Sequence, residues 1–256
     1  SRGLGDVYKR QPTWFVFENV YGLTKFKNGE ENIQNHIENR FRDIGYTVKS
    51  KILYASDFGV PQRRNRLFIV GNRNGIDFEF PKEFDYSVSV DEAISDLPVL
   101  GNGEIQMKGE YTVPFEQASP YAQLMRKKSK APTQNIVSRN KDYVVERYKY
   151  IGQGENWSSI PDRLMENYAD KKRCHSGIYK RLIGGKPSVV ISNYRKSMLI
   201  HPHQDRGLSV REAARLQSFP DHFIFEGPVS YVQQQIGNAV PPLLAKAVMK
   251  KILTYK

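Results

Sequence analysis

The chain has 256 residues, 39% of them hydrophobic, and carries a formal net charge of +12. Its size allows one large domain or two modest ones with packed cores. The apolar runs are too short to span a bilayer, the first residues lack the apolar core of a signal peptide, and a single cysteine excludes an internal disulfide. We therefore expect a cytoplasmic protein that makes no membrane contact.

The first predicted strand follows a segment without periodicity. Residues 1–12 should be poorly ordered. Trp14-Phe15-Val16-Phe17 then forms a short apolar run, and a strand that is apolar on both faces is typical of a parallel sheet covered by helices. Ligands bind beyond the carboxyl ends of such strands, where Glu18 and Asn19 fall. An ordinary solvated strand end is the alternative.

A helix and two strands are predicted next. The helical spacing is carried by Ile33, Ile37, Phe41 and Ile44. Gly45 should end this helix, and residues 46–55 and 66–71 should be strands. Three arginines lie between the strands within four residues, at 63, 64 and 66. Their guanidinium groups suit phosphates and carbonyl oxygens, although surface arginines in a turn would give the same pattern.

The middle of the chain is broken by glycine and proline and is strongly basic. Residues 81–109 are predicted to be a boundary or linker. Residues 121–150 hold eight Lys or Arg against two acids, and residues 171–187 hold six with no acid. Each stretch has a net charge of +6, so the two account for the whole excess. Such concentration favours a face that binds a polyanion, with a solvated basic surface as the alternative.

Two short sequence patterns occur near the end of the chain. Ser209 is a natural N-cap with Glu212 as its capping-box partner, and Pro220 should stop the short helix between them. Gly237–Pro242 reads as a loop that feeds a last helix, whose apolar face is Leu244, Val248 and Ile252. Free amides at such a helix start would suit an anionic or carboxylate-bearing ligand. Cys174 beside His175 shows no metal-ligand spacing, so we expect no metal site.

Together these segments resemble the carboxyl-terminal part of a DNA (cytosine-5) methyltransferase. The resemblance covers roughly residue 13 to the end of the chain and rests on four motifs in the family's order. They are ENV at Glu18–Val20, QxRxR at Gln62–Arg66, REAARLQxFPD at Arg211–Asp221 and GNAVPP at Gly237–Pro242. Weaker blocks at 154–161, 176–182 and 201–206 also match.

The resemblance implies an α/β fold: part of a Rossmann-like sheet of an S-adenosylmethionine-dependent methyltransferase, plus a smaller target recognition domain. Residues 1–12 would lie outside the family, 13–100 would be part of the catalytic domain, 101–206 the recognition domain, and 207–256 a return segment with the last helix. Asn238 should then lie near the carboxyl end of the sheet that contains Trp14–Phe17, far from Cys174.

The family's reaction transfers a methyl group from S-adenosylmethionine to carbon 5 of a cytosine flipped out of duplex DNA. The implied site residues fall into four groups. They are Glu18, Arg64 and Arg66 for the base; Asn238, Ala239 and Val240 for the cofactor; Gln62, Lys127, Lys128, Lys172, Arg173, Lys180 and Arg181 for DNA; and Asn19 and Arg211 for structure.

Several family features are not found in these 256 residues. Neither the FxGxG cofactor loop nor the Pro-Cys-Gln segment with the nucleophile occurs, and Cys174 lacks that context. We expect a fragment, inactive alone, whose residues 1–11 are foreign sequence. The alternatives are a non-catalytic DNA-binding module and a tRNA-methylating relative. The resemblance implies double-stranded DNA and a cognate restriction endonuclease as partners, for a monomer near the nucleoid of a bacterium or of a phage-infected cell.

Overall fold

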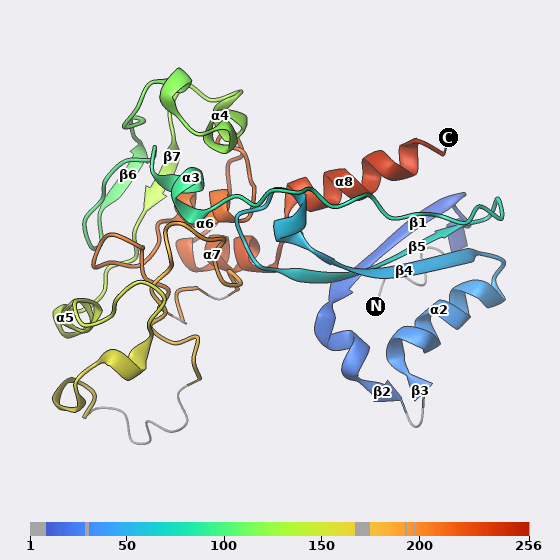
Figure 1. The fold of residues 1–256 in the computed structure, drawn as a ribbon, viewed down its shortest axis with the longest axis horizontal. Helices are drawn as coiled ribbons and strands as arrows, with labels where there is room; N and C mark the ends of the chain where they lie inside the picture. The colour runs from blue at the N-terminus through green and yellow to red at the C-terminus, as the bar shows by residue number, and fades with distance from the viewer. Residues whose placement is uncertain (1–8, 29–30, 167–174, 193, 197, 256) are drawn as a thin grey trace.

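The computed structural model describes residues 9–28, 31–166, 175–192, 194–196 and 198–255. These residues form two lobes joined side by side (Figure 1). The sheet lobe contains β1 (Trp14–Val20), η1 (Tyr21–Lys25), β2 (Lys27–Asn28), β3 (Glu31–Asn32), α2 (Ile33–Asp43), β4 (Thr47–Tyr54), η2 (Ala55–Phe58), β5 (Asn65–Asn72) and α8 (Pro242–Leu253). The second lobe contains α3 (Val90–Ile94), β6 (Ile105–Lys108), η3 (Phe115–Gln117), α4 (Pro120–Arg126), β7 (Thr133–Ile136), α5 (Asp142–Tyr148), η4 (Trp157–Ser159), η5 (Asp162–Leu164), α6 (Val210–Leu216) and α7 (Val229–Asn238).

The main sheet has the strand order β1-β5-β4, and both outer strands pair antiparallel with β5. The expectation of parallel neighbours is therefore wrong for the described strands. The cause is the connection: β4 turns into β5 through the short η2 segment, which reverses the chain direction. β1 and β4 run in the same direction, one on each side of β5. β1 is also less buried than expected, with only Phe15 fully enclosed, because it pairs with one neighbour along one edge.

Helices cover both faces of this sheet (Figure 1). The apolar face of α2, with Ile37 and Phe41, packs against Phe15 and Ile69 on one side. α8 packs on the other side, and the three residues that share its buried face are those predicted from the spacing. They are Leu244, Val248 and Ile252. The helix and strands predicted at 33–44, 46–55 and 66–71 are confirmed to within two residues.

The second lobe has its own core, in which α3, α4, α6 and α7 contribute side chains from widely separated parts of the chain. Val88 and Leu97 belong to this core, so the prediction that all of residues 81–109 form a linker is wrong. Residues 82–87 are the longest run of exposed residues in this range. The core takes side chains from both sides of residues 100 and 206, the predicted domain limits. A smaller cluster lies around α5 and the 3-10 turns that follow it.

The capping box predicted at α6 is confirmed. The Ser209 hydroxyl accepts the Glu212 amide at 3.1 Å, and the Glu212 carboxylate accepts the Ser209 amide at 2.7 Å. The same carboxylate takes two hydrogen bonds from Arg206, at 2.9 and 2.7 Å. Arg215, on the same helix, is fully buried between Asp96 and Asp221. Two buried arginines with carboxylate partners thus fix α6 in the middle of the second lobe. Among the described residues, no helix is long and apolar enough to cross a membrane.

Candidate functional site

A half-buried ion pair lies near the carboxyl end of β1. The antiparallel register sets Val20 opposite Arg66, which brings the Glu18 side chain to the start of β5. Arg66 Nε lies 2.8 Å from Glu18 Oε1, and Arg66 Nη1 donates to the carbonyl of Asn65 at 2.9 Å. The Glu18 side chain is 25% exposed and that of Arg66 10%. The pair is therefore partly open to solvent, as a contact with a ligand requires.

Burial controls the protonation of this pair. It raises the pKa of Glu18 above its ordinary value, although the charges of Arg66 and Arg64 act in the opposite direction. Burial also lowers the pKa of Arg66, although the charge of the Glu18 carboxylate acts to raise it. A carboxyl group that keeps its proton more readily can donate a hydrogen bond to an acceptor, while the guanidinium remains charged at neutral pH.

Arg64 has a different role from the expected one. Its side chain is buried, with Nη1 donating to the carbonyl of Ile191 at 3.1 Å and Nη2 to that of Gly237 at 2.7 Å. Burial, with help from the charge of Arg66, lowers its pKa to about 10. Since the guanidinium is enclosed by protein, the structure does not support the predicted contact between Arg64 and a nucleotide. Arg64 instead ties the start of β5 to the GNAVPP segment.

The Gly237–Val240 segment adjoins the start of β5, because Arg64 Nη2 donates to the carbonyl of Gly237. β5 starts beside the carboxyl end of β1, so the residue before Asn238 lies at the end of the sheet that the sequence predicted for Asn238. The predicted distance from Cys174 concerns a residue outside the described part of the chain. Gln217 donates to the carbonyl of Ile236 at 2.6 Å and so holds the end of α7. Asn238 is exposed, whereas Ala239 and Val240 are half-buried. The segment therefore exposes the polar side chain of Asn238 and part of the apolar side chain of Val240, while Gln217 holds its backbone in place.

The start of α8 does not offer the free amides that its position suggested. Pro241 and Pro242 have no N–H group, and the amide of Leu243 donates to the Ser218 hydroxyl at 3.1 Å. The amide of Ala245 already bonds back to the carbonyl of Pro241. Positions 242, 243 and 245 therefore offer no free amide, so this helix start has fewer donors for an anion than the sequence suggested.

Two of the residues expected to contact DNA are internal. Gln62 is fully buried; its amide donates to Gln217 Oε1 and to the carbonyl of Leu216, and its oxygen accepts the amide of Ile191. Arg181 is 6% exposed and donates to the carbonyls of Ile151, His201, Gln204 and Tyr148 and to Asp205 Oδ1. Both brace the interior of the protein, so neither can reach a duplex in this conformation.

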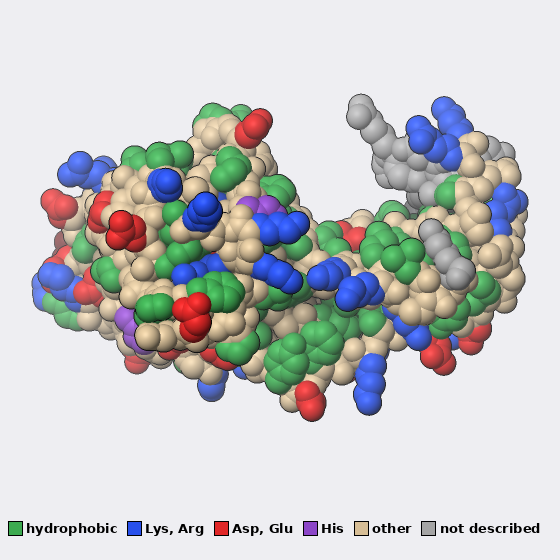
Figure 2. Space-filling model, turned by 90° about the horizontal axis from the view of Figure 1, so that it is seen from above, with side chains coloured by type: hydrophobic (Ala, Val, Ile, Leu, Met, Phe, Trp, Pro, Cys, Tyr) green, Lys and Arg blue, Asp and Glu red, His purple; other side chains and the backbone are tan. Residues whose placement is uncertain are grey.

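The remaining expected contacts are on the surface or outside the described residues. Lys127 and Lys128 follow α4 and are exposed. Lys180 is half-buried, and its ammonium group bonds to the carbonyl of Gly154. Lys172 and Arg173 lie outside the described residues. Figure 2 shows Lys and Arg side chains along the narrow part of the molecule between the lobes.

Asn19 and Arg211, which were expected to have structural roles, both make hydrogen bonds within the protein. The Asn19 side chain accepts the amide of Val20 at 2.8 Å, next to Glu18. Arg211 is fully buried and donates to the backbone and hydroxyl of Thr133 in β7 and to the carbonyls of Pro220 and Phe223. It thus joins α6 to β7. Across the described residues, no group of three or more His, Cys, Asp or Glu side chains is placed to hold a metal ion.

Gln217 and Ser218, which hold the GNAVPP segment by hydrogen bonds, were not predicted from the sequence. Both lie directly after α6, within the REAARLQxFPD segment at Arg211–Asp221, where these two positions had no predicted role. Ser218 has a φ of 64°, so its backbone leaves the helix in the left-handed region and turns its hydroxyl toward α8.

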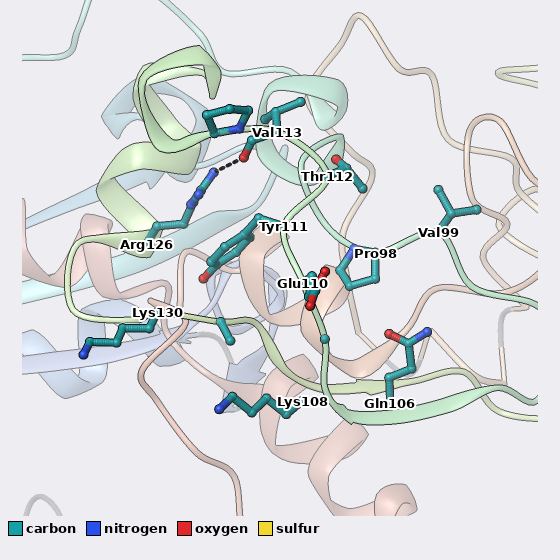
Figure 3. A pocket seen from close by; sticks show the side chains of 13 residues that line it. Pro98, Val99, Gln106, Lys108, Glu110, Tyr111, Thr112, Val113, Arg126 and Lys130 are labelled. Atoms are coloured by element: carbon teal, nitrogen blue, oxygen red, sulfur yellow. Dashed lines mark hydrogen bonds between the residues drawn. The ribbon is translucent and has the colours of Figure 1, made fainter.

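A hollow of about 1090 Å³ opens in the second lobe between α4 and the segment around β6 (Figure 3). Arg126 lies 3.8 Å over the ring of Tyr111 and donates to the carbonyl of Val113. The side chain of Arg126 also approaches Asp96 at 3.4 Å. Because protein groups already engage this guanidinium, the hollow is a weaker candidate for the chemical site than the Glu18–Arg66 pair.

The family description "C-5 cytosine-specific DNA methylase" matches residues 7–254. The chain belongs to this family. The match includes residues 7–12, which the sequence alone assigned to an unrelated segment. It also extends over both lobes, so the sheet lobe and the second lobe are parts of one family architecture.

Named relatives agree with this membership. The chain is 35% identical over 245 residues to the Type II methyltransferase M1.HphI of Haemophilus parahaemolyticus, covering 95% of this chain and 57% of the relative. It is 33% identical over 266 residues to M.DdeI of Desulfomicrobium norvegicum, covering 95% and 63%. The chain thus spans about three fifths of the length of these relatives.

Solved structures show the same fold. A protein described as a DNA modification methyltransferase encoded within a prophage (E. coli) superposes with a TM-score of 0.69 at 24% identity, covering 97% of this chain and 71% of that one. The Entamoeba histolytica methyltransferase EhMeth gives a TM-score of 0.53 at 12% identity, covering 95% and 63%.

Proposed function

We propose that these residues form the base-binding and DNA-recognition part of a DNA (cytosine-5) methyltransferase. The enzyme would transfer a methyl group from S-adenosylmethionine to carbon 5 of a cytosine flipped out of duplex DNA. The observation that carries the proposal is the Glu18–Arg66 pair, at 2.8 Å, partly exposed at the end of β1.

The pair suits the chemistry of a cytosine ring under attack. Addition of a nucleophile at carbon 6 places negative charge on the ring, and nearby donors stabilise that charge when they are already in place. Glu18 would hold a proton for ring nitrogen 3, since burial raises its pKa. Arg66 would donate to the exocyclic oxygen. Arg64 would act indirectly, by fixing the start of β5 against Gly237.

The GNAVPP segment fits one side of a cofactor site. The amide of Asn238 is exposed and has no protein partner among the described residues, and Val240 gives an apolar contact beside it. S-adenosylmethionine, when bound, would supply the methyl group. The chain's own contribution would be to orient it, with Gln217 and Arg64 holding the segment rigid from two directions.

The second lobe would bind the duplex, with residues 101–206 as the recognition region. Exposed lysines such as Lys127 and Lys128 would neutralise phosphates, while the loops of this region read base edges. The named relatives are Type II methyltransferases, so a cognate restriction endonuclease is a proposed partner of the same system. We further propose that the protein acts as a monomer in the cytoplasm.

The nucleophile is the part of the reaction that these 256 residues do not provide. Their single cysteine, Cys174, lacks the Pro-Cys-Gln context. We therefore propose that methyl transfer needs a further segment carrying that motif. The test compares transfer of labelled methyl groups to unmethylated genomic DNA by the 256-residue chain and by the product of the complete gene.

We expect no transfer above the blank for the chain alone and clear transfer for the complete product. Replacing Glu18 by Gln in the complete product should lower kcat about 100-fold or more, because the proton for the ring is lost. The control is Glu83→Gln, which removes an exposed carboxylate from the sheet lobe. Transfer by the chain alone would refute the need for another segment. Full activity of Glu18→Gln would refute the site.

A further inference from the structure

A pocket of about 520 Å³ lies where the two lobes meet, on the β4 side of the sheet lobe. Its lining comes from η2, from the segment that follows β5, from α3 and α4, and from α8. The lining residues are Phe58, Gly59, Phe84, Tyr86, Val88, Glu92, Pro120, Tyr121, Leu124, Leu243, Lys246, Ala247 and Lys250. Both lobes therefore contribute walls to one enclosure.

One wall is an aromatic pair that the fold leaves exposed. The rings of Phe84 and Tyr86 stack with centroids 5.2 Å apart and planes 15° apart. Phe84 is 46% exposed and Tyr86 57%, in a stretch whose neighbours are polar. Gly59, with a φ of 75°, packs beneath them, because a Cβ there would lie 3.6 Å from both side chains. Flat aromatic surface is thus held in place without being covered.

The rim of the pocket is basic. Lys246 and Lys250 are one turn apart on α8, and neither ammonium group has an ion pair or hydrogen bond with the described residues. The one acid in the lining, Glu92, has its carboxylate occupied by the amide and hydroxyl of Ser89 in a capping box. The lining therefore carries two ammonium groups against one carboxylate, and its net charge is positive.

The pocket is separate from the Glu18–Arg66 site. η2 follows β4, which pairs along one edge of β5, whereas Glu18 is on β1 along the opposite edge. The residues of α8 that enter the pocket are 243, 246, 247 and 250, not the buried face that packs on the sheet. Neither the expected base contacts nor the expected cofactor contacts line it.

We propose that this pocket binds a small anion with a flat apolar body, such as an aromatic carboxylate. Its volume is within the range of small-molecule sites, which are mostly apolar and have a few placed polar groups. The flat body would lie against Phe84 and Tyr86, and the anionic group would reach Lys246 and Lys250. Because α4 and α8 both line the pocket, an occupant would also hold the two lobes in one relative position.

The test uses 2-naphthoate as the probe and its neutral analogue 2-naphthamide, with binding to the 256-residue chain measured by calorimetry. We expect naphthoate to bind with a dissociation constant on the order of 0.1–1 mM, as for a ligand of about 13 heavy atoms. The neutral analogue should bind about threefold to tenfold more weakly, since it loses the charge contact.

Variants at exposed positions then locate the site without disturbing the fold. Tyr86→Ala should weaken naphthoate binding about tenfold by removing the stacking surface. Lys246→Gln with Lys250→Gln should make naphthoate bind no better than naphthamide. Lys251→Gln is the control, because Lys251 is on the same helix, outside the pocket, and faces Glu79.

Any of three binding results would overturn the proposal, apart from the control that follows: no binding of naphthoate at 5 mM, equal binding of the two probes to the unaltered chain, or binding that neither Tyr86→Ala nor the double lysine variant changes. Binding that Lys251→Gln weakens as much as the double variant would also refute the site. None of these outcomes depends on methyl transfer or on DNA binding. The pocket proposal can therefore fail while the proposed function holds, and the reverse is also true.

Discussion

At the scale of single residues, the three arginines of the QxRxR segment have three different environments. Arg63 is exposed, Arg64 is buried against two carbonyls, and Arg66 is paired with Glu18 at the edge of the site. The sequence indicates that such a cluster binds oxygen atoms, and this is what Arg64 does, but the oxygens belong to the protein. The partners are at positions 191 and 237, too far along the chain for local spacing to predict.

We therefore expect stability measurements to show that Arg64 stabilises the fold. Replacing it by Met leaves the carbonyls of Ile191 and Gly237 buried without donors, and we expect a loss of about 2–4 kcal/mol in the free energy of unfolding. Arg63→Met is the matched control, with an expected change within about 0.5 kcal/mol. Urea unfolding of both variants gives the comparison. Equal effects would contradict the assignment.

His201 gives the fold a dependence on pH. It is buried beside Arg206 and Glu212, and its Nδ1 accepts the amide of His203 at 3.1 Å. Burial lowers the pKa of His201 to about 4, although the Glu212 carboxylate acts to raise it. A proton at Nδ1 would remove the acceptor for that amide. The folded state therefore holds the imidazole neutral well below the pH at which the unfolded chain protonates it.

The stability of the chain should fall as the pH falls from about 6.5 toward 4. In this interval the unfolded chain takes up a proton at His201 and the folded chain does not, so unfolding is favoured by about 3 kcal/mol in total. His201→Gln keeps an acceptor but cannot titrate. Its free energy of unfolding, measured by urea at several pH values, should change less steeply between pH 6.5 and 4.5. Parallel curves for the two proteins would contradict the role of His201.

At the scale of elements, prediction succeeded where the signal is local. The capping box of α6, the buried face of α8 and the strand limits follow from neighbouring residues. Strand direction was not predicted correctly, although the short connection between β4 and β5 does not allow a parallel crossover. The start of α8 depends on a distant partner, because the amide of Leu243 donates to Ser218, 25 positions away. Short-range patterns contain no information on that contact.

The contact between α7 and the segment at 191–192 shows how close these elements lie. Gly237 faces the backbone of Ser192, and a Cβ at 237 would lie 2.0 Å from the Ser192 oxygen. Gly237→Ala must therefore push the segment away and strain the Arg64 contact. We expect a loss of at least about 2 kcal/mol in stability, measured by thermal or urea unfolding.

The control for this contact is Gly185→Ala. A Cβ at position 185 has nothing within 4 Å, and its φ is not in the left-handed region. The stability of that variant should change by less than about 0.5 kcal/mol. If Gly237→Ala proves equally harmless, the close approach does not determine how α7 and the 191–192 segment pack.

At the scale of the whole molecule, the cores combine segments from widely separated parts of the chain. α6 and α7 share a core with α3 and α4, and only α8 returns to the sheet. The resemblance to the family assigned Glu18 and Arg66 to one base, and the two residues, distant in sequence, become adjacent through the β1–β5 register. Hydrophobic periodicity could not have paired them.

The excess charge gives a final prediction, on duplex binding by the 256-residue chain. Each phosphate contact that is lost should reduce the slope of log K against log salt concentration by about 0.9. Lys127→Gln with Lys128→Gln should therefore lower that slope by about 1.8, measured by fluorescence anisotropy with a mixed-sequence duplex of about 30 base pairs. Lys49→Gln with Lys51→Gln changes the net charge equally, but these lysines are on β4 and are paired with Asp77 and Glu83. This control should leave the slope unchanged, because net charge alone adds no phosphate contact. Equal slopes for the two double variants would show that Lys127 and Lys128 are not DNA contacts.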